Sequence, residues 1–498
     1  MHKLIAILLT LLALAGAYSC TDTDTLPLAM EIVTPVDKDA FEGVARLKII
    51  VTDFTNEDRT SVYPFKPADG FADLSFELKD LDRFEHFTVE ILGEDAEERL
   101  VSRGRSSVID SLSESEQEFS VYFAPIGQLS MPPVNLVHPR LGAKVAVPGE
   151  NDALIIGGAG ANMEGEVLDS IAQVENFSAL FYKVEELEVE EEPFKLEEGL
   201  IHHSVTALDA FNVLVLGGYS KIGEQLTYMP EPLVISASET DLVQETVAGD
   251  FDTERIGHAA SKIPGAAQVF ISGGLDASGN ILDDAGIYTA GDRKTEKLLT
   301  LKSARHDHTQ SVVIDELAEF VGVLIYGGNS DASQPAEWWA ADAGKSIALQ
   351  LQDDEIRTGH AAATLSDRRA IIVGGNIDGQ LTASAVIFRE SCMNSDCEAL
   401  HLIDDFLKTP RKGHSVTLAE YDKLVVCGGV DAEGLAIGDC EIFKVGEDID
   451  IKAYAIIEMA HPRAYHAAAL MPDGTVALVG GWNEQAGALD SVEIYMPE

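Results

Sequence analysis

The sequence predicts an all-β chain whose larger part is a series of similar small sheets. Residues 26–125 alternate apolar and polar side chains, as in "HFTVEILG", which is typical of strands with one face on a core. Beyond them, a short apolar run that ends in a Gly pair occurs seven times, and short runs between turns suit strands buried on both faces. The first glycines of these pairs are Gly157, Gly217, Gly273, Gly327, Gly374, Gly428 and Gly480.

Residues 1–20 predict an export signal. His2 and Lys3 form a short basic start, and the apolar core from Leu4 to Ala17 is too short for a comfortable membrane span. The signal ends in "LAGAYSC", which resembles a bacterial lipobox and implies lipidation of Cys20. Ordinary cleavage after "AGA" is the alternative. A lipobox followed by Thr21 implies an outer-membrane lipoprotein of the cell envelope that contacts the membrane only through Cys20, with residues 21–25 as a tether.

Residues 26–125 predict a β-sandwich, immunoglobulin-like or similar. Their alternating stretches are separated by Asp, Gly and Asn turns and span about 100 residues. The Cys-Trp-Cys framework of antibody domains is missing, so only the architecture is predicted. We expect this domain to act as a spacer or as a second binding module.

The seven-fold pattern extends upstream and downstream of the Gly pairs. Arg-x-x-His precedes five of them, at Arg255, Arg305, Arg357, Arg411 and Arg463, and strands such as "AEWW", "CEIF" and "VEIY" follow. This order resembles the kelch repeat, which implies a seven-bladed β-propeller of four-stranded blades over residues 126–498. A departure from kelch is that Trp338, Trp339 and Trp482 do not lie in the outer strand, where kelch units usually carry a Trp.

The two ends of the repeat region predict how the ring closes. The seventh copy stops after "SVEIYMPE" with three strands, whereas "NLVHPR" before the first copy matches "EMAHPR" before the seventh. We therefore expect residues 126–137 to supply the outer strand of the last blade.

The repeated Arg and His side chains are candidates for binding, but a structural role is the main alternative. The arginines are satisfied by neighbouring carbonyls or acids, or they form a cationic ring on the face that also carries the loops after the Gly pairs. Exposed aromatic side chains beside guanidinium groups make this face the predicted binding site. The candidate binding residues are Arg255, Arg305, Arg357, Arg411, Arg463, Tyr219 and Trp482.

Four cysteines follow Cys20, and they predict two disulfides. Cys392 pairs with Cys397 and Cys427 with Cys440, since each pair is close enough to join one hairpin in an exported protein. A metal site at these cysteines would need clustered His residues or further Cys residues, and His414 is the only candidate near them in the sequence. We expect no metal and no cofactor.

The charge and the motifs favour a noncatalytic binding protein. A net charge of −49 disfavours nucleic acid and anionic lipid as partners. No galactose-oxidase-like copper site, sialidase turn or hydrolase motif stands out. We therefore expect an envelope lipoprotein whose propeller loops bind an envelope or extracellular protein or a glycan. The alternatives are a carbohydrate-active enzyme (an oxidase, isomerase or lyase) and a purely structural envelope component.

Overall fold

The chain is an all-β protein. The computed structural model describes residues 28–53, 58–64, 86–110, 117–149, 153–176, 194–196, 198–237, 242–249, 251–315, 317, 319–330, 334–341, 344–351, 356–365, 367–393 and 397–498. Over these residues it contains strands, two 3₁₀ turns (Glu390–Cys392 and Glu420–Asp422) and no α-helix. No helix in the described part is long and apolar enough to cross a membrane. The predicted signal, tether and Cys20 lie outside the described residues.

The N-terminal unit consists of two sheets that pack on one core. A parallel pair is formed by β1 and β7, and a six-stranded sheet has the order β3-β2-β4-β5-β8 with β6 on β4. Met30 and Val121 of the pair share an apolar cluster with Leu47, Ile49 and Ile91 of the larger sheet. The strands are β1 (Leu28–Val33), β2 (Arg46–Asp53), β3 (Asp58–Pro64), β4 (His86–Glu94), β5 (Leu100–Arg105), β6 (Ile109–Asp110), β7 (Gln117–Tyr122) and β8 (Ala124–Pro125).

Seven sheets, each with four antiparallel strands, recur along the rest of the described chain, and we number them in chain order; one of them has a fifth strand, and smaller sheets of two or three strands come from the segments between these strands. Sheet 1 contains β10 (Lys144–Ala146), β11 (Leu154–Ile156), β14 (Gln173–Asn176) and β15 (Phe194–Lys195); sheet 2 contains β16 (Ser204–Ala207), β17 (Asn212–Leu216), β20 (Leu233–Ala237) and β21 (Leu242–Thr246). Sheet 3 contains β24 (Ala259–Ile263), β25 (Gln268–Ser272), β27 (Asp284–Thr289) and β28 (Lys294–Thr300), with β22 (Ala248–Gly249) added in parallel to β28. Sheet 4 contains β29 (Thr309–Ile314), β30 (Phe320–Tyr326), β31 (Ala336–Ala340) and β32 (Lys345–Leu349).

The remaining three sheets repeat this arrangement. Sheet 5 contains β34 (Ala361–Leu365), β35 (Arg369–Val373), β38 (Ala385–Arg389) and β39 (Leu400–Ile403); sheet 6 contains β40 (Ser415–Ala419), β41 (Lys423–Cys427), β42 (Asp439–Val445) and β43 (Ile451–Glu458). Sheet 7 contains β44 (Ala467–Leu470), β45 (Val476–Val479), β48 (Val492–Met496) and β9 (Gln128–Ser130). The fourth strand of sheet 7 therefore comes from the front of the chain, within residues 126–137.

The strand β9 is paired and buried. It lies antiparallel to β48, with Leu129 opposite Tyr495. Leu129 is 2% exposed and packs in one cluster with Tyr495 and with Ile442 of sheet 6. Because this strand completes a sheet formed by the last residues of the chain, it holds the two ends of the repeat region together.

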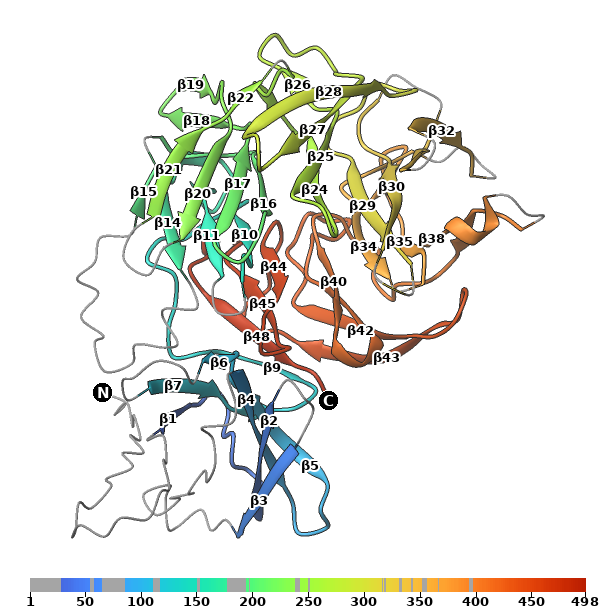
Figure 1. Ribbon diagram of the computed structural model, residues 1–498. Helices are drawn as coiled ribbons and strands as arrows, with labels where there is room; N and C mark the ends of the chain where they lie inside the picture. Colours follow the sequence, from blue (N-terminus) through green and yellow to red (C-terminus); the bar gives the residue numbers. More distant parts are fainter. Residues whose placement is uncertain are drawn as a thin grey trace.

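Neighbouring sheets share apolar cores in a cycle. Six clusters join sheets 1 to 7 pairwise in order, and a seventh combines Ala143 and Ile155 near or in sheet 1 with Ala477 and Val479 of sheet 7. The first strands contact one another in the same order, and β44 also contacts β10. Figure 1 shows the sheets arranged around a common centre with these first strands nearest to it.

Short strands follow or precede the Gly pairs on one side of the sheets. They are β12 (Ala159–Ala161), β13 (Val167–Ser170), β18 (Tyr219–Ile222), β19 (Gln225–Tyr228), β23 (Arg255–Ile256), β26 (Leu275–Asp276), β33 (Arg357–Thr358), β36 (Asn376–Ile377), β37 (Gln380–Leu381), β46 (Trp482–Asn483) and β47 (Gly487–Ala488).

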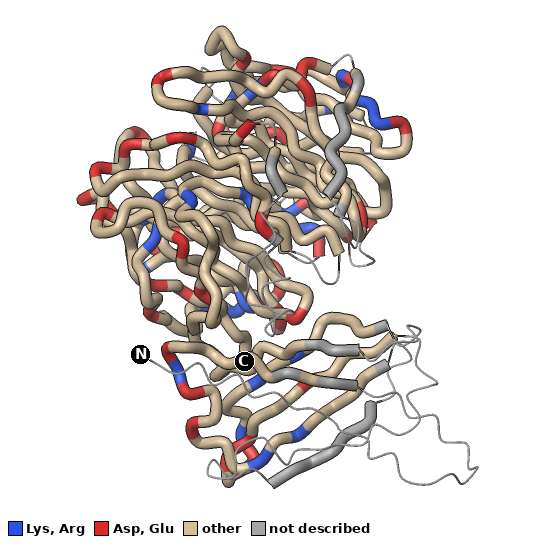
Figure 2. Tube along the Cα trace, turned by 90° about the vertical axis from the view of Figure 1, so that its left-hand side faces the viewer, with Lys and Arg blue, Asp and Glu red and all other residues tan. Residues whose placement is uncertain are grey.

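The N-terminal unit packs against sheets 6 and 7. Tyr122 shares an apolar cluster with Val479, and its hydroxyl lies 2.9 Å from the Oγ of Ser130, the last residue of β9. Arg103 and Arg105 both pair with Glu420, at 3.2 and 3.1 Å, in the turn between β40 and β41. Figure 2 shows the unit lying next to the sheets, and it shows acidic residues spread over the loops of both.

Candidate functional site

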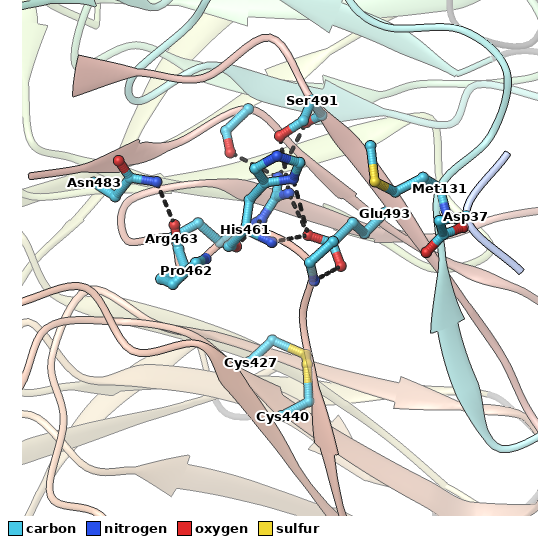
Figure 3. Close-up of polar contacts among 12 residues, drawn as sticks. Asp37, Met131, Cys427, Cys440, His461, Pro462, Arg463, Asn483, Ser491 and Glu493 are labelled. Carbon is cyan, nitrogen blue, oxygen red and sulfur yellow. Dashed lines mark hydrogen bonds and ion pairs between the residues drawn. A yellow bond between two sulfur atoms is a disulfide. The ribbon is translucent and has the colours of Figure 1, made fainter. Parts of the chain in front are cut away.

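The repeated arginines are buried structural groups. Arg463 has no exposed surface. Its Nη1 donates to the carbonyl oxygens of Gly480 at 2.9 Å and Ser491 at 3.0 Å, and its Nη2 pairs with Glu493 Oε1 at 2.7 Å (Figure 3). Glu493 in turn accepts the backbone N–H groups of Ala460 at 2.8 Å and His461 at 3.0 Å. The pair therefore ties the Gly turn to the connection that enters sheet 7.

The other copies use the same contacts. Each repeated Arg donates to the carbonyl of the first glycine in its Gly pair, as Arg411 does to Gly428 at 3.1 Å. Four of these arginines also form an ion pair with a carboxylate of the third strand. The pairs are Arg140 with Glu175, Arg255 with Asp284, Arg305 with Glu337, and Arg411 with Glu441. The alternative in which Arg255, Arg305, Arg357, Arg411 and Arg463 form an exposed cationic ring is wrong for this structure, because all five side chains are 0% exposed.

The repeated histidines join neighbouring sheets. His360 Nε2 lies 2.9 Å from Thr309 Oγ1 of sheet 4, and His466 Nε2 lies 2.8 Å from Ser415 Oγ of sheet 6. Burial lowers the pKa of both imidazoles to about 3. They are therefore neutral near pH 7 and act as inter-sheet hydrogen-bond groups.

The residue just before each repeated His position forms what we call the collar. Its members all have positive φ, between 52° and 70°, and are Gly142, His202, Gly257, Asp307, Gly359, Gly413 and Tyr465. Backbone N–H groups link them around the inner strands: Gly413 donates to Gly359 at 2.9 Å, Tyr465 to Gly413 at 2.8 Å and Gly142 to Tyr465 at 3.1 Å. The collar therefore lies at the axial end of the inner strands, on the side of the Gly pairs.

Three collar positions carry side chains where the backbone favours glycine. Glycine fills four of the seven, but His202 has φ 57°, Asp307 has φ 52° and Tyr465 has φ 53°. A nonglycine residue in this region costs about 1–2 kcal/mol, and such residues concentrate at functional sites. His202 and Asp307 are exposed, and Tyr465 is 45% exposed, so burial does not account for their presence.

A lysine and the collar carboxylate interact electrostatically. Lys144, the first residue of β10, has exposed surface but is crowded by protein, and desolvation lowers its pKa while Asp307 raises it. Desolvation also lowers the pKa of His202, with Asp307 again acting in the opposite direction. Asp307 Oδ2 lies 2.8 Å from His306 Nδ1. Asp307 therefore opposes the effect of desolvation on both groups.

The collar therefore offers varied polar chemistry. Asp307 supplies a carboxylate and His202 an imidazole whose pKa is lowered, and Lys144, two residues after Gly142 in the chain, adds an amine. Tyr465 adds a phenol whose pKa is raised by desolvation, so its hydroxyl stays protonated near neutral pH. Such a set suits a ligand with several hydroxyl or charged groups. No group of three His, Cys, Asp or Glu side chains that could hold a metal ion occurs among the described residues.

Of the two predicted aromatic binding residues, one adjoins the collar. Tyr219 stacks on His202 with ring centroids 5.8 Å apart, and it lies 6.0 Å from Tyr228. Trp482 instead donates its indole N–H to the Asn162 carbonyl at 3.2 Å. Tyr219 therefore extends the collar outward, whereas Trp482 supports a neighbouring hairpin.

Sequence reasoning missed Lys144, His202, Asp307 and Tyr465. The signal for three of them was present, because the residue before His is glycine in "RIGH", "RTGH" and "RKGH" and is replaced in "IHH", "RHDH" and "RAYH". The signal for Lys144 was weaker. Lys144 follows the repeated His position, where other copies have Ser204, Thr309 and Ser415, so it stands out only when the copies are aligned.

Both predicted disulfides are present. Cys392 and Cys397 are joined with Cα atoms 5.1 Å apart, and Cys427 and Cys440 with Cα atoms 4.1 Å apart. The second bond links directly opposed residues of β41 and β42. Disulfides are typical of exported proteins.

No protein-family model matches the sequence, and no curated protein matches it significantly. The argument for function therefore depends on the fold and on the collar.

Proposed function

We propose that residues 126–498 form a seven-bladed kelch-type β-propeller, with each numbered sheet as one blade. The support is the cycle of shared cores from sheet 1 to sheet 7 and back, together with the strand β9 that completes the last sheet. In this interpretation the collar is the mouth of the central channel, a position where propellers present loop residues on a rigid scaffold.

The proposed function is noncatalytic binding of a glycan or of a protein's polar side chains at the collar. The observation that carries it is the presence of His202, Asp307 and Tyr465 at positions where the backbone favours glycine. These side chains are exposed on strained backbone, and we propose that contact with a ligand offsets the strain in addition to the contacts of His202 with Tyr219 and of Asp307 with His306. Tyr219 beside His202 adds an aromatic face on which a sugar ring or a planar side chain can stack.

The chain is proposed to act at the cell envelope as a lipoprotein anchored at Cys20. The two disulfides support export, and the lipobox-like sequence supports the anchor. Incorporation of labelled palmitate into the wild type but not into a Cys20→Ser variant is expected, and equal labelling of the two would contradict the anchor.

A carbohydrate-active enzyme is the second candidate, and Lys144 favours it. An amine whose pKa is lowered by desolvation, with a carboxylate acting in the opposite direction, is a combination that also occurs in active sites. Chemical conversion of a bound sugar, lost in Lys144→Met but not in Lys412→Met, would favour catalysis. Copper at one equivalent in the purified protein would favour an oxidase.

Screening tests the binding proposal first. The chain lacking residues 1–20 should be applied to a glycan array and to envelope extracts, and any ligand recovered should be titrated against variants. His202→Gly and Tyr465→Gly are expected to weaken binding at least about tenfold while Leu435→Ser, on another loop of the same side, leaves it unchanged. Unchanged affinity in both glycine variants would overturn the proposal.

A further inference from the structure

Sheets 1 and 2 carry longer loops after the Gly pair than the other sheets. Fourteen residues separate the second glycine from the third strand in these two sheets, against seven to ten in the other five. The additional residues build two hairpins, β12–β13 and β18–β19. The five sheets with shorter loops show that the ring does not require these hairpins.

The two hairpins are fixed against each other. The Gly223 N–H donates to Asp169 Oδ1 at 2.7 Å, and the Lys221 N–H donates to Ser170 Oγ at 3.0 Å. Trp482 of β46, just after the Gly pair of sheet 7, supports the tip of β12–β13 through its bond to the Asn162 carbonyl. These contacts make the pair a rigid feature of the collar side, with β18 and β19 at its outer edge in Figure 1.

A groove of about 610 Å³ lies where the hairpins meet. Val167, Leu168 and Ile171 give it apolar walls, and Glu166, Asp169 and Glu224 line it with carboxylates. We call this feature the hairpin groove.

Large apolar side chains remain uncovered on the same hairpins. Leu168 is 46% exposed, Ile222 is 68%, Leu226 is 50%, and Met163 at the tip of β12–β13 is 61%. Rigid hairpins that the fold does not need, and that expose several large apolar residues, mark an interaction surface.

The charge of the groove selects the partner. Three carboxylates line it against one amine, that of Lys221, which donates to the Val167 carbonyl. A second copy of this chain, with a net charge of −49, would be repelled, and so would an anionic lipid surface. A segment with basic groups satisfies the carboxylates, and its apolar side chains cover Leu168 and its neighbours.

We propose that the hairpin groove docks a segment of a partner protein that combines basic and apolar side chains. The groove is separate from the collar residues, so this docking does not depend on the ligand proposed for the collar. It makes the chain an adaptor with two binding surfaces on one side of the ring.

The test uses the chain lacking residues 1–20 and a fluorescein-labelled peptide of alternating Lys and Leu residues, followed by fluorescence anisotropy. Two variants address the groove: Leu168→Ser, and Glu166→Gln with Glu224→Gln. The matched controls are Leu435→Ser, exposed on the loop of sheet 6, and Glu296→Gln with Glu433→Gln, which remove the same charge elsewhere. A Lys/Ser peptide shows how much binding is electrostatic alone.

Each groove variant should weaken binding of the Lys/Leu peptide at least about tenfold, whereas the controls should change it less than about twofold. Equal weakening in the groove and control charge variants would show attraction to the acidic surface as a whole and would overturn the proposal. So would equal affinity for the Lys/Ser peptide. A concentration-dependent dimer that is lost in the leucine variant, or binding to anionic vesicles, would replace the partner protein with a second copy or a membrane.

Discussion

Replacing His202 by glycine tests whether this side chain is needed for folding or for binding at the collar. The native residue has φ 57°, a conformation that costs a nonglycine residue about 1–2 kcal/mol. Glycine removes this cost but gains freedom in the unfolded chain, which lowers stability by about 0.5–1 kcal/mol. The lost contact with Tyr219, at 5.8 Å, subtracts about 0.5 kcal/mol more. The unfolding free energy of His202→Gly should therefore stay within about 1 kcal/mol of wild type.

The unfolding free energy is measured by urea titration with circular dichroism as the signal, and a variant at another collar position is the control. Gly359→His places the same side chain at a matched collar position where glycine is native, with φ 63° and a new Cβ 3.2 Å from the Lys412 Cβ. It should lower stability by about 1–2 kcal/mol. If His202→Gly instead lowered the unfolding free energy by more than about 2 kcal/mol, the imidazole would be needed for folding and the inference from strain would fail.

Stability should fall as the pH drops from 6.5 towards 3, because burial holds the pKa of His203, His258, His360, His414 and His466 near 3 while the unfolded chain binds protons near pH 6.5. At pH 5.5 each such histidine lowers the unfolding free energy by about 1.4 kcal/mol. The unfolding free energy of His360→Gln, measured by urea titration, should therefore depend less steeply on pH than that of wild type. An equally steep dependence would contradict the buried neutral state. Glu493→Gln leaves the buried Arg463 without its carboxylate and should cost about 3–5 kcal/mol, whereas Glu458→Gln on exposed β43 should stay within about 0.5 kcal/mol. A loss below about 1 kcal/mol for Glu493→Gln would show that the ion pair is not structural. Deletion of residues 128–136 removes β9 and should lower the melting temperature of all seven sheets together, and retention of the wild-type value would refute closure by this strand.

The repeating sheets could be predicted because glycine is required at specific backbone positions. Gly480 has φ 61°, and a Cβ there would lie 2.6 Å from the carbonyl oxygen of Arg140, in the segment that leads into the neighbouring sheet 1. No other residue fits such an approach, so each Gly pair marks the end of a second strand in the sequence itself. The disulfides were predictable for a similar reason, since each joins residues of one short segment.

The role of the arginines could not be read from their own motif. An Arg beside a glycine turn is compatible with an exposed or a buried position, and the difference lies in the carboxylate that it meets. That partner is on the third strand, about thirty residues downstream, as Glu493 is for Arg463. The Glu of "VEIY", "CEIF" and "AEWW" was visible, but its contact with the arginine depends on how the first and third strands are brought together.

The collar side chains were hidden for a different reason. Glycine signals a positive φ in the sequence, whereas His202, Asp307 and Tyr465 adopt a positive φ without that signal, as other nonglycine residues of the chain also do. Lys144 and Asp307 are more than 150 residues apart in the sequence, and the effect of the carboxylate on the pKa of the amine exists only in the folded chain. Sites assembled across a ring therefore require the structure.

Covalent footprinting of the collar tests the central claim most directly. The chain should be labelled at histidine, tyrosine and carboxylate side chains with and without a ligand recovered from the screens, and the sites should be read by mass spectrometry. Protection of His202, Asp307 and Tyr465, with unchanged labelling of exposed Glu296 and Glu433, is the expected result. Full labelling of all three collar residues in the saturated complex would contradict binding at this position.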